Sequence, residues 1–336
     1  MKANLKDDDK MELKKTTRRT FLRNMAVSAA AISITPVPAS ACMTIDTIKG
    51  NVPMKKRDVK HVLVLWYSQT GNTERMGRLI SKTLEKRGIT VTASEMREFD
   101  LSHFPDVDLI IAGSPVFYYD TPDYAKKWID AMPDLKGTPV AAYVTYGGPE
   151  GNQHNAACSI LRHLSDRGGV PVGLKWFMNM STFPLAWSEE KVHHKTWMSR
   201  DLPNENTYKD ARAYASFLVS QVEQGKDSVF SKKLTLREMS IFFGPEWWTK
   251  KIVKNHSIDK DKCIQCGTCV DKCPAHAIDI DQFKIDRKSC VLCFGCINNC
   301  PVQAVTMTYN GEKVSGYPEF MKQKKLKIIE PEELQG

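Results

Sequence analysis

Short apolar runs alternate with helix-patterned segments between residues 57 and 224. Residues 62–65 are all apolar, as is typical of a parallel strand that helices cover on both faces. In the segment that follows, residues 72–86, apolar side chains recur at helical spacing. Further strands are predicted at 90–92, 109–112, 140–144 and 169–173, and further helices at 124–131, 155–166 and 208–222. Five strands separated by helices predict one doubly wound α/β domain.

The rest of the chain after residue 224 divides into three segments. Residues 225–255 are predicted as a linker, residues 256–310 as a small cysteine-rich domain, and residues 311–336 as a tail that no motif explains. We expect the apolar side chains of the linker to pack against a neighbouring element. Contact with a membrane surface is the alternative. These side chains are Phe230, Ile241, Phe242, Phe243, Trp247 and Trp248.

The first 42 residues have the organisation of an export signal behind a short leader. Residues 1–10 precede Met11, and a basic region then leads into an alanine-rich apolar region. Ala39-Ser40-Ala41 fits the small-residue rule for signal cleavage. The predicted fold therefore excludes residues 1–42.

The basic region contains Thr17-Arg18-Arg19-Thr20-Phe21-Leu22-Arg23. This stretch resembles the twin-arginine export motif, Ser/Thr-Arg-Arg-x-Phe-Leu-Lys, and a frayed amphipathic basic helix is the alternative interpretation. The resemblance implies that a folded, cofactor-loaded protein is exported to the periplasm. Ala39-Ser40-Ala41-Cys42 also resembles a weak lipobox, so membrane attachment through an uncleaved signal or a lipidated Cys42 is the alternative to simple cleavage.

Length and charge limit the classes of function. A chain of 336 residues is long enough for two or three domains. The net charge is +9, of which residues 1–42 contribute +4, and no basic block accompanies a nucleic-acid-binding module. No apolar run approaches the length of a membrane span. The composition therefore favours a modular globular protein that binds no nucleic acid and excludes a polytopic membrane protein.

Eight of the ten cysteines form two copies of one pattern. In each copy the cysteines follow one another at steps of three, three and four residues, and a proline comes next. The first copy is Cys263, Cys266, Cys269, Cys273 and Pro274, and the second is Cys290, Cys293, Cys296, Cys300 and Pro301. A disulfide framework has little room in such short steps, and structural zinc normally uses separated Cys pairs. Iron–sulfur ligation fits the spacing best, with unligated thiols as the remaining alternative.

The two copies resemble a bacterial ferredoxin that holds two 4Fe-4S clusters. The resemblance implies that the first three cysteines of each copy bind one cluster and the fourth crosses to the other. One cluster would be held by Cys263, Cys266, Cys269 and Cys300, and the other by Cys290, Cys293, Cys296 and Cys273. It also implies single-electron transfer without a substrate-binding position.

A polar loop directly follows the first predicted strand. It reads Ser68-Gln69-Thr70-Gly71-Asn72-Thr73 and opens a helix, so its amides and hydroxyls converge on an anion such as phosphate. The loop lacks the glycine and lysine patterns of ATP-binding and dinucleotide-binding loops. A simple Ser/Thr-capped helix start is the alternative.

The loop matches Ser/Thr-x-Thr-Gly-x-Thr and thereby resembles the FMN-phosphate loop of flavodoxins. The resemblance implies a five-stranded parallel sheet of order 2-1-3-4-5, with the flavin ring held by the loops after the third and fourth strands. Those loops supply Pro115, Val116, Phe117 and Tyr118, and Thr145, Tyr146, Gly147 and Gly148. Residues 176–206 exceed a minimal flavodoxin and are expected to cap the flavin or meet a partner, with His193 and His194 on the solvated surface.

The whole chain resembles a flavodoxin-ferredoxin fusion with an export signal. The resemblance implies an electron-transfer protein with two 4Fe-4S clusters and FMN, which serves redox protein partners. An FMN-dependent reductase of a quinone or another small acceptor is the alternative, so whether the protein is an enzyme stays open.

Overall fold

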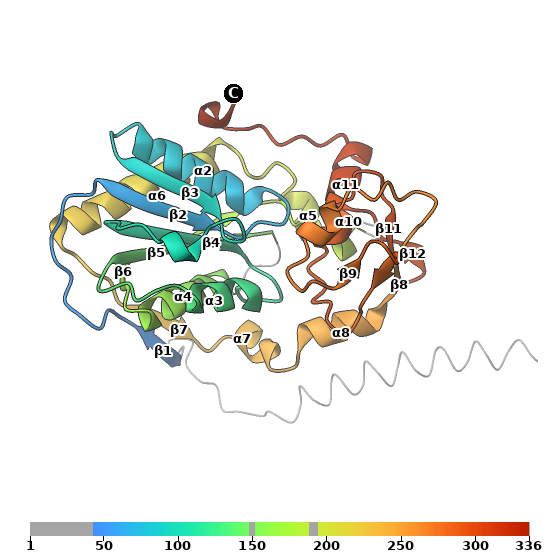
Figure 1. Cartoon of the computed structure of the whole chain (residues 1–336), viewed down its shortest axis with the longest axis horizontal. Coiled ribbons are helices and arrows are strands. Elements are labelled where there is room, and N and C mark those ends of the chain that lie inside the picture. The colour runs from blue at the N-terminus through green and yellow to red at the C-terminus, as the bar shows by residue number, and fades with distance from the viewer. Residues whose placement is uncertain (1–42, 148–151, 188–193, 336) are drawn as a thin grey trace, which may run out of the picture. The chain divides into compact units, whose positions relative to one another are not determined.

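Five parallel strands form the central sheet of the computed structural model, which describes residues 43–147, 152–187 and 194–335 (Figure 1). Across the sheet the strands are β3 (Thr90–Glu95), β2 (His61–Trp66), β4 (Leu109–Pro115), β5 (Pro139–Tyr146) and β6 (Val170–Met178). Counted from β2 along the chain, this order is 2-1-3-4-5. The predicted flavodoxin-like fold class is therefore confirmed.

Helices cover both faces of this sheet (Figure 1). The four main ones are α2 (Asn72–Glu85), α3 (Asp123–Asp130), α4 (Gln153–Asp166) and α6 (Glu205–Gln224). Val62 and Val64 pack in the core with α2 and α6, whereas Leu63 and Leu65 pack in the core with α3 and α4. The continuous apolar run follows from this double burial, because burying each such side chain contributes about 1.5–3 kcal/mol.

A two-stranded antiparallel ribbon lies against α4. It pairs β1 (Thr44–Ile48) with β7 (Phe230–Lys233), and the Arg162 guanidinium of α4 binds the Asp46 carboxylate of β1. Residues 225–255, predicted as a linker, therefore begin with a strand. They continue into α7 (Leu236–Ile241) and α8 (Pro245–Ile252).

The predicted packing of the linker aromatics is wrong for four of them. Phe242, Phe243, Trp247 and Trp248 are exposed. Both helices are short, and α8 turns its Thr249 side inward, so the consecutive aromatics point away from the protein. Phe230 packs as expected, against the core beneath α4.

The cysteine-rich domain is a small α+β unit. Its three-stranded sheet is formed by β12 (Glu312–Lys313), β11 (Val305–Tyr309) and β8 (Val253–Ile258), beside a hairpin of β9 (Ile278–Asp279) and β10 (Lys284–Ile285). Each cysteine copy leads into one short helix, α9 (Thr268–Asp271) or α10 (Gly295–Asn299). This unit confirms the second part of the predicted fold class.

The C-terminal tail returns to the main sheet domain. After α11 (Tyr317–Gln323), Glu330 receives two hydrogen bonds from Arg75 of α2, at 2.7 and 2.6 Å. In the short helix η3 (Glu332–Leu334), Glu333 receives two from Arg212 of α6, at 2.9 and 2.8 Å. The tail therefore ties the cysteine-rich domain to α2 and α6.

Three further short elements complete the described structure. Helix η1 (Leu101–His103) precedes β4, while η2 (Pro184–Ala186) and α5 (His194–Met198) lie within the insertion at 176–206. No helix among the described residues has the length and hydrophobicity needed to cross a membrane.

Candidate functional site: a pocket beside two sets of cysteines

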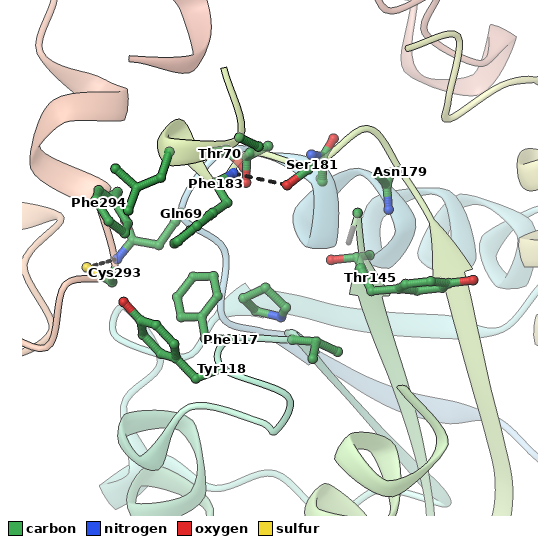
Figure 2. A pocket seen from close by; sticks show the side chains of 18 of the residues that line it. Gln69, Thr70, Phe117, Tyr118, Thr145, Asn179, Ser181, Phe183, Cys293 and Phe294 are labelled. Atoms are coloured by element: carbon green, nitrogen blue, oxygen red, sulfur yellow. Dashed lines mark hydrogen bonds between the residues drawn. The ribbon is translucent and has the colours of Figure 1, made fainter. Parts of the chain in front are cut away.

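A cavity of about 480 Å³ lies where strands β2, β4 and β5 end. Figure 2 shows side chains that line it. The predicted residues that border it are Ser68, Gln69, Thr70, Asn72, Thr73, Pro115, Val116, Phe117, Tyr118, Thr145, Tyr146 and Gly147. Gly71, the N-cap of α2, is not among the lining residues, and Gly148 lies outside the described residues. The structure thus brings three separate loops together.

The loop after β2 has the donor set that a phosphate group requires. Gly71 adopts a left-handed backbone (φ 83°), and as the N-cap of α2 it supplies no side-chain hydrogen bond to the first-turn amides. The Ser68 hydroxyl is buried and has no hydrogen-bond partner in the structure, and the same holds for the Asn179 amide oxygen. A buried hydroxyl without a partner is costly, so Ser68 fits a site completed by an anion.

The loop after β4 is a tight turn of aromatic residues. Tyr118 and Tyr119 both have positive φ angles, 49° and 73°, and Phe117 and Asp120 exchange backbone hydrogen bonds across the turn at 2.9 and 3.0 Å. Left-handed non-glycine residues are uncommon and gather at functional sites. Burial raises the pKa of Tyr118, so its hydroxyl stays protonated and donates to the Leu292 carbonyl at 3.0 Å.

The loop after β5 closes the cavity against the end of β6. Thr73 and Thr145 join the first and third loops through a hydroxyl contact of 2.7 Å. Gly147 lies so close to the Ser181 backbone that a Cβ atom would collide with it. Sequence reasoning missed Asn179 and Ser181 as pocket residues, although their place after the fifth strand puts them at the same edge of a parallel sheet.

The insertion at 176–206 lies over the cavity. Thr182, Phe183 and Leu185 line it, and the ring of Phe183 meets Phe294 of the cysteine-rich domain edge-on at 5.2 Å. His194 is exposed, as expected, and His193 lies outside the described residues. The expectation that the insertion caps the site is consistent with this placement.

The eight cysteines separate into two sets. Cys263, Cys266, Cys269 and Cys300, the first cysteine set, line one small cavity. The second cysteine set is Cys273, Cys290, Cys293 and Cys296, whose mutual proximity is seen in the electrostatics: besides burial, the other three thiols raise the pKa of Cys296. In each set the fourth cysteine comes from the other copy of the sequence pattern.

The duplication extends to the hydrogen bonds around the sulfurs. The amides of Gln265 and Leu292, at equivalent positions, donate to Cys263 and Cys290 at 3.4 Å. Another equivalent pair, Ala277 and Ala304, donates to Cys273 and Cys300 at 3.3 and 3.1 Å. Amide donors to ligand sulfurs stabilise negative charge and tune the potential of an iron–sulfur cluster.

Burial and hydrogen bonding shift the pKa values of the cysteine thiols in opposite directions. Burial raises the pKa of Cys293 to about 12, whereas hydrogen bonds from Thr268 lower the pKa of the exposed Cys266. Metal ligation requires thiolates, so iron would supply the positive charge that the buried second set needs. Among the described residues, no three His, Cys, Asp or Glu side chains are arranged to hold one metal ion.

Two family models match the chain. Residues 64–173 match the flavodoxin model, and residues 256–279 match the model of a 4Fe-4S binding domain. The chain thus combines one segment similar to flavodoxins with one similar to 4Fe-4S binding domains. The flavodoxin domain supports FMN as a cofactor, and the 4Fe-4S binding domain supports one iron–sulfur cluster. Together they support an electron-transfer protein.

Solved structures with similarity to the chain include several flavodoxins. Flavodoxin 2 from Bacillus cereus is 20% identical over 48% of this chain and 99% of its own, with a TM-score of 0.37. A flavodoxin from the domain Archaea is 16% identical over 48% and 99%, also at 0.37. Rubredoxin oxygen:oxidoreductase from the anaerobe Desulfovibrio gigas is 15% identical over 51% of this chain and 38% of its own, at 0.36. No curated protein matches the chain.

Gln69 connects the flavodoxin domain to the second cysteine set. Its side-chain amide donates to the Lys272 carbonyl at 2.9 Å and lies 3.6 Å from the Cys293 sulfur (Figure 2). Asn299 donates back to the Gln69 carbonyl at 2.9 Å. Gly295 leaves the space for this contact, because a Cβ atom there would collide with the Gln69 side chain.

Proposed function

We propose that the chain passes single electrons between two 4Fe-4S clusters and FMN. The observation that carries the proposal is the position of Cys293, which both belongs to the second cysteine set and lines the flavin pocket. When bound, the clusters would exchange one electron at a time and FMN would store up to two. The chain's own residues supply position, burial and hydrogen bonds.

The proposal of two clusters rests on the symmetry of the two cysteine copies. The family match covers only the first copy. The second copy repeats its spacing, its following proline and its amide-to-sulfur hydrogen bonds. Each cysteine set would hold one cluster, with Cys300 and Cys273 as the crossing ligands.

FMN would be held by the three loops of the flavin pocket. In the proposed arrangement, the Ser68 hydroxyl and the first-turn amides of α2 bind the phosphate, and residues 115–118 and 145–147 hold the ring. Gly148 is proposed with the ring loop from the sequence resemblance alone.

Exposure gives the two cysteine sets different roles. In the first set Cys266 is exposed, and its neighbour Ile264 is 62% exposed. In the second set Cys296 is buried, and Cys293 faces the flavin pocket. We therefore propose that a redox protein partner docks at the first set and that electrons cross the second set to reach FMN, or return by the same path.

Analysis of one anaerobic preparation tests the cofactor assignment. The expected content is about eight iron, about eight acid-labile sulfide and one FMN per chain. Zinc without sulfide would overturn the cluster assignment, and about four iron would restrict it to one cluster. Rapid mixing with a one-electron reductant should then show cluster bleaching followed by flavin reduction. Independent reduction of the two chromophores would contradict the transfer path.

We also propose export by the twin-arginine route, with the working protein in the periplasm. The support is the motif at residues 17–23, in a part of the sequence outside the described residues. Arg18→Lys combined with Arg19→Lys should leave the protein in the cytoplasmic fraction. Unchanged export of this variant would refute the route without affecting the cofactor assignment.

A second candidate function is an FMN-dependent reductase of a quinone or a similar small acceptor. It is favoured by the apolar part of the cavity beyond the predicted flavin loops, where Pro245, Ile252 and Tyr309 contribute to the wall. Steady-state reduction of a soluble quinone faster than the same concentration of free FMN would support it. A rate equal to that of free FMN would exclude the reductase and favour a carrier that exchanges electrons with redox proteins.

A further inference from the structure

The segment formed by α7 and α8 carries a dense group of exposed apolar side chains. Among the described residues, seven of the exposed large hydrophobic side chains lie within seventeen consecutive positions. Phe242 is 85% exposed, and Trp247 and Trp248 are each more than half exposed. The group, here called the α7–α8 face, consists of Leu236, Met239, Phe242, Phe243, Trp247, Trp248 and Ile252. A patch of this kind marks an interaction surface.

The charges around the α7–α8 face are mainly positive. Residues 236–254 contain four Lys or Arg and two acidic residues. Of the acids, Glu238 is buried against Lys232, and Glu246 pairs with Lys250 at 2.9 Å. Lys251 lies over the Trp247 ring, 4.9 Å from its centre. Aromatic and aliphatic side chains flanked by lysine are typical of helices that lie in the headgroup region of a bilayer.

The chain enters the described structure beside this face. The Met43 carbonyl accepts a hydrogen bond from the Leu234 amide at 2.8 Å, two residues before Leu236. The first described residue, Met43, therefore lies next to the start of α7. The same face adjoins the flavin pocket, because Pro245, Thr249 and Ile252 of α8 contribute to the pocket wall.

We propose that the α7–α8 face docks onto the surface of a bilayer that contains anionic lipids. The tryptophans and phenylalanines enter the interface, and Arg237, Lys250, Lys251 and Lys254 meet the phosphate headgroups. Docking places the α8 side of the flavin pocket toward the bilayer. The proposal does not depend on the electron-transfer function, since it concerns a surface outside both cysteine sets.

Charge argues against the N-terminal segment as the occupant of this face. Residues 1–42 carry a net charge of +4, and residues 236–254 carry +2. Like charges would oppose contact between them, whereas an anionic membrane attracts both.

Vesicle sedimentation with the full-length, cofactor-loaded protein tests the proposal. Vesicles of phosphatidylcholine with phosphatidylglycerol are compared with phosphatidylcholine alone. The variant F242S/F243S/W247S/W248S should bind the anionic vesicles at least about tenfold more weakly than the wild type. K250Q/K251Q should lose about fivefold per lysine on anionic vesicles only. The matched control W176S/F217S changes two exposed aromatics elsewhere and should bind like the wild type.

The depth to which the tryptophans enter the bilayer is measured by the quenching of their fluorescence with brominated lipids. W247F/W248F should retain binding but lose most of the quenching that the wild type shows. Retained cluster absorbance and FMN show that each variant is folded. Wild-type-like binding by the quadruple serine variant would assign any membrane contact to residues 1–42 and overturn the proposal. The proposal would equally fail if the wild type bound no vesicles and formed a dimer that the quadruple variant lost.

Discussion

The side-chain amide of Gln69 donates a hydrogen bond to the sulfur of Cys293 over 3.6 Å. Gln69 stands in the loop proposed to bind the flavin phosphate, and Cys293 stands in the second cysteine set. The two proposed cofactor sites therefore share a direct contact between side chains. The amide oxygen of Gln69 is buried without a partner, so this side chain is held by its donors alone.

Replacing Gln69 with leucine should lower the potential of the cluster at the second cysteine set. The variant loses a donor that stabilises the added negative charge of the reduced state. A hydrogen bond of about 1 kcal/mol corresponds to about 40 mV for one electron, so a fall on the order of 50 mV is expected. EPR-monitored redox titration measures it. Gln265→Leu is the matched control, because that exposed side chain can be changed while its backbone amide still donates to Cys263. Equal shifts in both variants would contradict a specific role for Gln69.

Replacing Ser68 with alanine should weaken FMN binding without destabilising the cofactor-free protein. The hydroxyl is buried and lacks a protein partner, so its removal costs the folded chain nothing and removes a donor to the phosphate. The dissociation constant should rise about tenfold or more, since a hydrogen bond to a charged group contributes about 1.5–3 kcal/mol. Flavin fluorescence titration and thermal unfolding measure the two effects.

Ser165 provides the control for this experiment. Its hydroxyl is likewise buried and unpartnered, but it lies in α4 and does not line the pocket. Ser165→Ala should leave FMN affinity unchanged. A Ser68→Ala protein that binds FMN as tightly as the wild type would remove Ser68 from the proposed phosphate site.

Replacing Cys300 with alanine should damage the cluster of the first cysteine set, although Cys300 belongs to the second sequence copy. Cys273→Ala should damage the other cluster. Each variant should lose roughly half of the iron and sulfide or convert one cluster to a three-iron form. EPR can distinguish the clusters, since only the cluster of the second set should respond to the Gln69 substitution. The crossed arrangement would be refuted if Cys300→Ala instead damaged the cluster of the second cysteine set, or if Cys273→Ala damaged that of the first.

Replacing Glu333 with glutamine should loosen the C-terminal tail. Hydrogen bonds from Arg212 hold the pKa of Glu333 at about 2, below its ordinary value of 4.5. A depressed carboxyl pKa stabilises the fold above pH 4.5, and this contribution disappears as the pH falls toward 2. At pH 7 the variant should melt about 3–8 °C lower, for a loss of about 1.5–3 kcal/mol. The difference in melting temperature between the variant and the wild type should be the same at pH 8 and pH 5. Its absence at pH 5 would contradict the low pKa of Glu333. Glu332→Gln, an exposed neighbour, is the control.

The sheet domain could be predicted from sequence because its signals are local. The apolar run at β2 and the helical periodicity of α2 reflect burial that repeats along the chain. The helix predicted at 72–86 is observed as Asn72–Glu85, and the one at 155–166 as Gln153–Asp166. Gly71 could be predicted from the resemblance of its loop to the FMN-phosphate loop, and its left-handed backbone is a conformation that favours glycine.

Contacts between segments that are distant in sequence leave no local pattern of apolar residues from which they could be predicted. The pairing of β1 with β7 joins residues far apart in sequence, and neither strand is strongly apolar. The bond from Gln69 to Cys293 depends on how two domains meet, which spacing within either domain does not encode. The acidic tail could not be interpreted for the same reason, since its partners Arg75 and Arg212 are more than a hundred positions away.

The return of the tail to α2 and α6 affects when the protein can mature. Glu330 and Glu333 follow every proposed cofactor ligand in the sequence, yet they complete the surface of a domain whose first strands are synthesised much earlier. These contacts between the two domains can therefore form only after all the proposed cofactor ligands have been synthesised. Cofactor insertion can precede these contacts, and a chain stopped just before Glu330 would keep every proposed cofactor ligand while losing the bonds to Arg75 and Arg212.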